Sequence, residues 1–335
     1  MVPETLRDSL VARLDRFGPA KEVAQIGAAI GREFSHRLLS AVASLPPDRL
    51  SAALEDLAGA ELIFASGDSP ETIYTFKHAL VQDAAYSTLL KSRRRQLHAG
   101  IVTALERDFP DQVQAQPELI AYHATNAEQF ETAVGYWCKA GERGLARAAM
   151  KEANAVYSRA LDLARRLQPS DRRERAELEI LLELGRTQQA IRGSVSDECG
   201  QTFGRARQLA ERSGRAEHLV EALKGLMYFH HGRTELKRAA KVADARLKLS
   251  KRLGWQPEIV AAYDDLATVS FSNGDFQHAL DLSSSALSII EAADRYSWSS
   301  DIEDVHRSVL ILCAQTMTVL GFRAQAGEVR AAGWF

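Results

Sequence analysis

Residues 266–287 have the sequence LATVSFSNGDFQHALDLSSSAL, and their spacing of small residues is the main evidence for the fold. Ala279 and Ala286 are seven residues apart, so they lie two turns along one face of a helix. Small side chains at such positions let a neighbouring helix approach closely. Gly274, just before this helix, permits a tight turn. The stretch therefore predicts two helices packed as a pair.

The same spacing recurs along the C-terminal two thirds of the chain. It is found at Phe130, Ala133 and Ala140, at Ala153 and Ala160, and more loosely at Gly232 and at Gly321 with Ala326. The turn glycines Gly193, Gly232, Gly274 and Gly321 are separated by 39, 42 and 47 residues. This is longer than the roughly 34 residues of a standard tetratricopeptide repeat (TPR). We therefore expect a TPR-like α-α superhelix over residues 116–335, with longer helices or wider connections than usual.

Such an array buries each repeat against its neighbours and leaves a concave groove, in which we expect a protein or peptide partner to bind. After Gly321 there is room for one short helix, and the residues from Gly327 to Phe335 provide no polar capping repeat. Solenoids normally need such a cap. We therefore expect the repeat array to be truncated at the C-terminus.

The N-terminal part contains the alternating pattern of a β-hairpin. Apolar and β-branched runs at 62–65 and 72–76 flank the turn-forming residues 67–70. Amphipathic stretches at about 4–16, 20–43 and 48–59 precede it, the second of them broken within by Gly31. Two more helices follow at about 78–90 and 92–108. Helices followed by a two-stranded wing are typical of a winged-helix domain, which we expect over residues 1–110. The predicted fold class is thus all-α, with this one hairpin.

The composition is that of a globular protein. The 335 residues are 46% hydrophobic and 26% charged, and the formal charge of -2 gives no general attraction to nucleic acid or to anionic membranes. No apolar run approaches the roughly 20 residues that span a bilayer, and the N-terminus lacks a signal-peptide core, so we expect a cytoplasmic protein. Cys138, Cys199 and Cys313 lie far apart in apolar helical contexts, where thiols pack as small hydrophobic groups.

Residues 76–86, FKHALVQDAAY, and the following Leu89-Leu90, Arg93-Arg94-Arg95 and Leu97-His98 resemble a motif of STAND-type signalling ATPases. Residues 3–6, 12–17 and 26–34 are similar to the stretch that follows the ATPase core in that family. The resemblance covers about residues 3–165. It implies a bacterial signal-transduction protein in which a P-loop ATPase core, and often a class III adenylate/guanylate cyclase domain, precedes the winged helix and TPR array. Full-length relatives would then bind ATP.

The sequence nevertheless lacks the parts that catalyse. It has no G-x-x-x-x-G-K-[ST] loop to cradle nucleotide phosphates, no acidic strand end to hold magnesium, and no cyclase metal-binding region. No Ser/His/Asp or Cys/His arrangement of catalytic spacing is present either. We therefore expect no catalytic residue, metal or cofactor in this chain. We predict a regulatory and protein-interaction module of a signalling ATPase or adenylate cyclase.

Two alternatives remain open at this stage. The chain could be a fragment of a STAND-type transcriptional activator whose output domain binds DNA, or a free-standing TPR adaptor. The genomic sequence on either side of the reading frame distinguishes the three. A cyclase or P-loop upstream favours the regulator, a helix-turn-helix favours the activator, and neither favours the adaptor.

His78 is the candidate site residue. It follows the predicted wing at the start of a helix, where backbone amides and the helix dipole suit a phosphate. In related switch ATPases a winged-helix histidine senses bound ADP, so the resemblance implies a nucleotide-sensing role for His78, assisted by Lys77. The alternative is a histidine that caps the helix or packs beneath the wing. Asp83 and Tyr86 are expected to brace the helix rather than to contact a ligand.

Three further groups have a structural interpretation beside a functional one. The cations from Lys91 to Arg95 can contact DNA phosphates, but the acidic residues that follow favour a solvated helix face, so nucleic acid is not an expected partner. His230 and His231 diverge by about 100° on a helix and cannot readily share a metal. The nearby aromatic residues are expected in the repeat core rather than in a ligand groove; they are Tyr228, Phe229, Trp255 and Tyr263.

Overall fold

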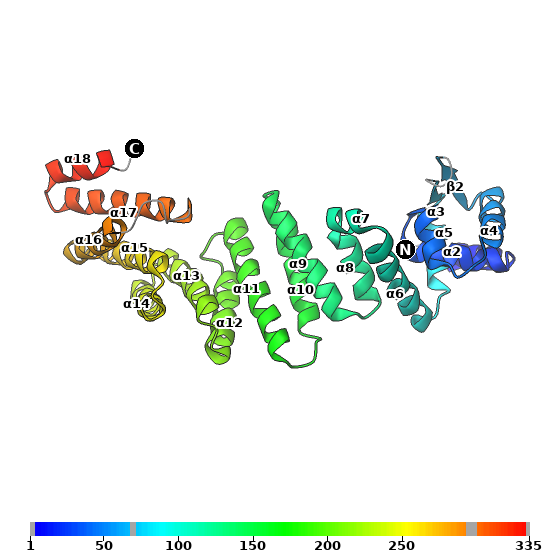
Figure 1. Cartoon of the computed structure of the whole chain (residues 1–335), viewed down its shortest axis with the longest axis horizontal. Helices are drawn as coiled ribbons and strands as arrows, with labels where there is room; N and C mark the ends of the chain where they lie inside the picture. The colour runs from blue at the N-terminus through cyan, green and yellow to red at the C-terminus, as the bar shows by residue number, and fades with distance from the viewer. Residues whose placement is uncertain (1–3, 68–71, 293–299, 333–335) are drawn as a thin grey trace. The chain divides into compact units, whose positions relative to one another are not determined.

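The computed structural model describes residues 4–67, 72–292 and 300–332. Figure 1 labels most of its elements. In chain order they are α1 Glu4–Asp15, α2 Pro19–Ile30, β1 Glu33–Ser35, α3 His36–Val42, α4 Pro47–Gly59, β2 Ile63–Ser66, β3 Ile73–Phe76, α5 Ala79–Ser87, α6 Lys91–Asp108, α7 Pro110–Ala115, α8 Pro117–Asn126, α9 Phe130–Ala146, α10 Met150–Ala164, α11 Asp171–Arg192, α12 Asp197–Ser213, α13 Ala216–Gly232, α14 Leu236–Leu253, α15 Gln256–Ser272, α16 Phe276–Ala292, α17 Ser300–Val319 and α18 Arg323–Ala332.

The chain forms two compact units. Unit 1 consists of Met1–Arg143 with Asp162–Leu167, and unit 2 consists of Gly144–Leu161 with Gln168–Phe335. Helix α8 belongs to unit 1 because it packs on α6 and α7. The domain boundary predicted at residues 110–116 marks where the repeat pattern starts. The two units are instead defined by compactness, so the two divisions need not coincide. That boundary and the winged-helix assignment remain predictions.

The predicted hairpin is confirmed. Strands β2 and β3 pair antiparallel, with Ile63 opposite Phe76, while most of the predicted turn at 67–70 lies outside the described residues. A third strand, β1, pairs with β3 and gives the order β1-β3-β2. The amphipathic stretch at about 20–43 is broken at Gly31, as predicted, although the strand β1 that follows was not predicted. The stretch is interrupted because Gly31 is extended, with φ 164° and ψ -173°, and because the Ser35 hydroxyl caps a new helix by accepting from the Leu38 N–H at 3.1 Å.

Unit 1 is built around one continuous apolar core. Helix α2 lies at its centre and packs on α4, α5 and α6, which explains why all of Ile26–Ile30 are buried. Phe34 of β1 and Phe76 of β3 bring the sheet into this core, with ring centroids 5.6 Å apart. The Phe34 ring also lies against Gly27, where an added Cβ would be 2.7 Å from the ring. The sheet is thus anchored on α2 through its inner face.

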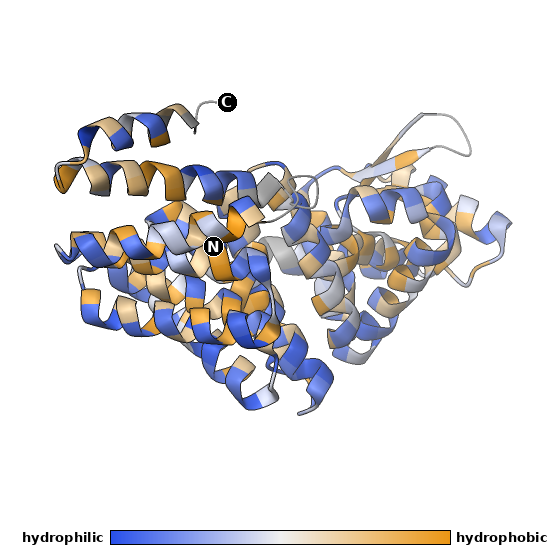
Figure 2. Ribbon diagram, turned by 60° about the vertical axis from the view of Figure 1, so that its left-hand side comes forward, coloured by the Kyte–Doolittle hydropathy of each residue, from blue (hydrophilic) through white to orange (hydrophobic). Residues whose placement is uncertain are grey.

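Unit 2 contains the TPR-like array. From α11 to α18 each helix packs on the next, and the first helices of the pairs, α11, α13, α15 and α17, also pack on one another. The all-α, TPR-like fold class predicted from the sequence is confirmed. Figure 2 shows hydrophobic and hydrophilic residues interspersed along these helices, as expected for helices buried on one side. Ala279 and Ala286, which predicted the pairing, are fully buried.

The turns between paired helices follow the prediction in three of four places. Gly193, Gly274 and Gly321 have φ of +80°, +81° and +93°, which favours glycine. The fourth place was predicted wrongly, because Gly232 lies within α13 and Thr234, with φ +59°, takes the left-handed position. A threonine at this conformation carries no sequence signal.

Candidate functional site

Lys77 and His78, the predicted nucleotide-sensing residues, lie between β3 and α5. Lys77 forms an ion pair with Glu61, and its amino group lies 5.5 Å from the centre of the Phe64 ring. His78 occupies the N-cap position of α5 but makes no side-chain capping hydrogen bond, and its side chain is exposed. The structure therefore shows neither of the two structural roles considered for His78, and its sensing role remains a prediction.

The basic run at the start of α6 is engaged within unit 1. Lys91 and Arg95 both pair with Glu128, at 3.6 and 3.1 Å. Arg93 pairs with Glu22 at 2.9 Å, and Arg94 donates to the Ser87 carbonyl at 3.0 Å. These partners support the interpretation as a solvated helix face, because each guanidinium already has an acceptor.

Two histidines form a buried pair in unit 1 that the sequence did not indicate. His98 of α6 and His123 of α8 have no exposed surface, and their Nδ1 atoms are 2.8 Å apart. The Tyr86 hydroxyl lies 2.9 Å from His98 Nε2, so one chain of hydrogen bonds links α5, α6 and α8. Burial, reinforced by Arg94, lowers the pKa of His98 to about 4, and burial and His98 lower the pKa of His123 to about 3. Both rings are neutral at pH 7.

Unit 2 contains a buried ionic triad. Arg246 of α14 is 1% exposed and forms ion pairs with Glu258 and Asp265 of α15. Burial raises the pKa of Asp265 and outweighs the opposing effect of Arg246. The triad joins the second helix of one pair to the first helix of the next.

Polar contacts join the first helices of neighbouring pairs. Arg186 of α11 donates to Glu221 of α13 at 2.9 Å, His231 of α13 lies 2.9 Å from the Ser272 hydroxyl of α15, and the Ser308 hydroxyl of α17 donates to Asp264 of α15 at 2.7 Å. Burial raises the pKa of Asp264 to about 6. Each of these contacts joins the first helix of one pair to the first helix of the next, where the helices also pack on one another.

The adjacent histidines and the aromatic residues have separate positions. His230 Nδ1 lies 2.7 Å from Glu235, so His230 and His231 bind different partners. Tyr263 packs with Leu247 and Ile259, as predicted for repeat core, whereas Tyr228 is 42% exposed. Burial around the Tyr228 hydroxyl raises its pKa to about 12.

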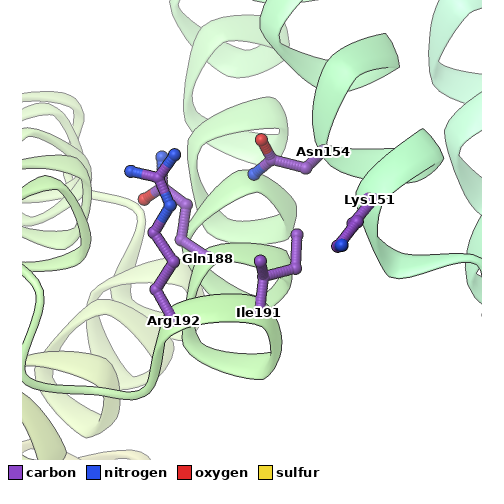
Figure 3. Close-up of a pocket in the computed structure, with 5 residues that line it drawn as sticks. All are labelled: Lys151, Asn154, Gln188, Ile191 and Arg192. Carbon is purple, nitrogen blue, oxygen red and sulfur yellow. The ribbon is translucent and has the colours of Figure 1, made fainter.

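A pocket of about 230 Å³ in unit 2 is the candidate binding site (Figure 3). Lys151 and Asn154 come from α10, and Gln188, Ile191 and Arg192 come from α11. Spacings of three and four residues place each set on one helix face. Figure 3 shows Gln188 and Arg192 side by side, with Lys151 and Asn154 across from them. No sequence motif marks these residues, since they come from two helices whose pairing only the fold determines.

Some polar groups of this pocket have hydrogen-bond or ion-pair partners and others do not. The Asn154 amide donates to the Thr187 hydroxyl at 3.0 Å, which orients the side chain, and Arg192 forms an ion pair with Glu198. Within the described residues Lys151 has no hydrogen bond or ion pair, and the buried Gln188 Oε1 has no hydrogen-bond partner. The pocket thus offers a free ammonium group, an amide acceptor and the apolar Ile191. It can bind a group that carries both N–H and C=O.

Three further properties of the described part of the chain concern metal binding, membrane spanning and the cysteines. No cluster of three or more His, Cys, Asp or Glu suited to a metal occurs there, and none of its helices has the length and apolar character needed to cross a membrane. Cys199 and Cys313 are free thiols, and Cys138 is partly buried. Cys199 and Cys313 are buried, as predicted for small hydrophobic groups, and burial raises the pKa of Cys199 to about 11.

Comparison with known proteins shows similarity at two levels. No family model matches the chain. An uncharacterized protein of Rhizobium meliloti (strain 1021) is 30% identical over 212 residues, which cover 62% of this chain and 20% of that protein. The chain therefore spans about a fifth of the length of the curated relative it matches.

Solved structures show the fold. BtubC (BKLC) from P. vanneervenii is similar over 68% of this chain and 92% of its own, with 18% identity and a TM-score of 0.50. The apo form of RapI is similar over 97% of this chain and 75% of its own, with 14% identity and a TM-score of 0.50. A STAND protein with a tetratricopeptide repeat sensor from Pyrococcus horikoshii matches over 94% of this chain and 50% of its own, with 11% identity and a TM-score of 0.49. At these identities the first two likenesses concern the fold alone.

Proposed function

We propose that the chain is a regulatory interaction module whose unit 2 binds a peptide or an extended protein segment. The observation that carries this function is the pocket between α10 and α11, where Gln188 Oε1 is buried without a partner among the described residues and Lys151 is unpaired there. An extended backbone presents an N–H to the Gln188 oxygen and a C=O to the Lys151 ammonium. A side chain of the same segment then contacts Ile191.

A peptide selection tests this proposal. The intact chain is immobilised and used to enrich random 12-residue peptides, and their affinities are measured by fluorescence anisotropy. We expect one group of peptides to lose about tenfold or more in affinity, or about 1.4 kcal/mol, when Lys151→Glu or Gln188→Leu is introduced. Arg207→Gln, on the exposed surface of α12, is the matched control and leaves the affinity unchanged. If no enriched peptide responds to either pocket variant, the proposal fails.

The wider context of this module is part of the same proposal. The motif at residues 76–98 resembles STAND-type signalling ATPases, and the curated relative extends far beyond the matched region. We therefore place the module beside an ATPase or cyclase domain that it regulates in a cytoplasmic signalling protein. Sequencing the flanking genomic region tests this, since an encoded P-loop or cyclase domain supports it and a DNA-binding output domain contradicts it.

His78 is the proposed link to nucleotide state. Its exposed ring at the N-terminus of α5 leaves it accessible to a phosphate presented by a neighbouring domain. In a protein that includes the ATPase core, His78→Ala is expected to lower ADP retention. Unchanged retention would remove His78 from the mechanism.

A further inference from the structure

Unit 1 carries an exposed apolar and cationic patch at the start of α6, distinct from the pocket of unit 2. Leu90, the N-cap residue of α6, is 75% exposed, the largest value among the exposed large hydrophobic residues of the described chain. Tyr122 of α8 is 48% exposed. We call the set formed by Tyr86, Leu90, Lys91, Arg94, Arg95 and Tyr122 the Leu90 patch.

Contacts within unit 1 hold this patch together. The Arg94 guanidinium lies 4.7 Å from the centre of the Tyr86 ring, and the Arg94 N–H donates to the Leu90 carbonyl at 2.9 Å. Tyr86 bonds to His98, and the His98 ring meets the Tyr122 ring edge-on at a centroid distance of 5.9 Å. Arg94, Tyr86 and Tyr122 are therefore held by contacts within unit 1 before a partner binds.

The charges of the patch indicate the chemistry of its partner. Lys91, Arg94 and Arg95 contribute three positive charges, and the one carboxylate among them, Glu128, is shared by Lys91 and Arg95. The Lys91 side chain is 86% exposed and its 3.6 Å contact with Glu128 is long, so it has donors to spare. A local excess of positive charge in a chain of net charge -2 attracts an acidic partner.

We infer that the Leu90 patch docks an acidic protein segment that carries a leucine or aromatic side chain. The exposed Leu90 and Tyr122 gain from burial against an apolar side chain of the partner, whereas they gain little against a phosphate backbone. Arg94 is committed to the Ser87 carbonyl and the Tyr86 ring, which leaves fewer cations to follow nucleic acid. Tyrosine and arginine, which the patch also contains, are enriched among the residues that contribute most to binding at protein interfaces.

Leu90→Asp tests the inference without endangering the fold, because aspartate is a favourable N-cap residue and Leu90 is exposed. Peptides of 12 residues are selected on the intact chain, and the acidic ones that contain Leu, Phe or Trp are measured by fluorescence anisotropy. We expect affinity to fall about tenfold or more with Leu90→Asp and with Lys91→Glu, and to fall as salt is raised. Phe64→Ala, at a residue 51% exposed on the sheet of the same unit, is the matched control and has no effect.

Two results would overturn the inference. One is that no acidic peptide is enriched whose binding responds to Leu90→Asp. The other is that a 20-base-pair duplex DNA binds more tightly than the peptides and loses affinity with Lys91→Glu but not with Leu90→Ala, which identifies a nucleic-acid surface. Because these variants lie in unit 1, the result is independent of the pocket variants at Lys151 and Gln188.

Discussion

Unit 1 buries a pair of histidines and unit 2 buries an ionic triad, and the two clusters tolerate burial for different reasons. In unit 1 the pair His98–His123 is buried because both rings are neutral. In unit 2 Arg246 is buried because two carboxylates compensate its charge. Protonation of either histidine should therefore destabilise unit 1, whereas loss of one member of the ionic triad should destabilise unit 2.

The apolar cores of the two units differ in how far one cluster of buried residues extends. Unit 1 has one continuous cluster that extends from α1 to α8. Between α14 and α17 of unit 2, small groups of buried residues are shared by neighbouring helices, such as Val260, Ala286 and Val309. A destabilising substitution should therefore affect the whole of unit 1, whereas in unit 2 it should affect mainly the helices next to it, as in other repeat proteins.

Loss of the central cation should have the largest effect. Arg246→Met leaves Asp265 buried and unpaired, so we expect unit 2 to lose about 3–5 kcal/mol of unfolding free energy. Arg238→Met, at an exposed position on the same helix, should change it by less than about 0.5 kcal/mol. Chemical denaturation combined with hydrogen exchange on α14 and α15 measures both. Replacing Glu258 and Asp265 by leucine in the Arg246→Met background should restore most of the loss, and its failure to do so would show that charge pairing is not the cause.

Acid should destabilise unit 1 first. The unfolded histidines, with pKa near 6.5, take up protons below that pH, whereas the pKa values of native His98 and His123 are about 4 and 3. Their stabilising contribution is therefore complete above about pH 6.5 and is lost as the pH falls. At pH 5 the loss amounts to about 2 kcal/mol for each histidine.

Asp264 should respond in the opposite direction. Its native pKa of about 6 lies above the unfolded value of 3.8, so native unit 2 binds this proton first. Between pH 7 and pH 5 this group adds about 1 kcal/mol of stability. Hydrogen exchange at pH 7 and pH 5, corrected for intrinsic rates, should show α6 and α8 opening before α15 and α17. Opening of unit 2 first would refute the contrast between the two clusters.

Substitutions at two glycines near Phe203 test whether a destabilising change in unit 2 stays local. A Cβ at Gly225 of α13 would lie 2.5 Å from the Phe203 ring of α12, so Gly225→Ala should cost about 1–3 kcal/mol. Gly204→Ala on α12 meets no atom within 4 Å and should instead gain about 0.5–1 kcal/mol from helix propensity. Hydrogen exchange should show the Gly225→Ala damage confined to α11–α14. Equal loss of protection in α17 would contradict local coupling.

The smallest effect is expected at the turn before α14. Thr234→Gly removes a β-branched residue from φ +59° and should add about 1 kcal/mol to the stability of unit 2. Gly274→Ala, at φ +81° in the equivalent turn before α16, should cost a similar amount. Thermal melts of both variants test the pair, and destabilisation by Thr234→Gly would show that the threonine side chain has a compensating role.

Local patterns predicted most of the helices and the hairpin because they depend on residues close together in the chain. The seven-residue spacing of Ala279 and Ala286 identifies a buried face without any knowledge of its neighbour. β1 was missed because three residues are too few to establish an alternating pattern. The pocket was missed as well, since Lys151 and Gln188 line it from two different helices.

Arg246 illustrates which properties follow from local sequence spacing and which depend on the packing of separate helices. It lies seven residues after Ala239, where the α16 pattern has Ala286, so the repeat spacing alone places this arginine on a buried helix face. Which groups neutralise it, however, depended on the packing of α15, just as the meeting of His98 with His123 depended on the packing of α8 on α6. Periodicity specifies the buried face of one helix, but contacts between buried polar groups exist only once separate helices are brought together.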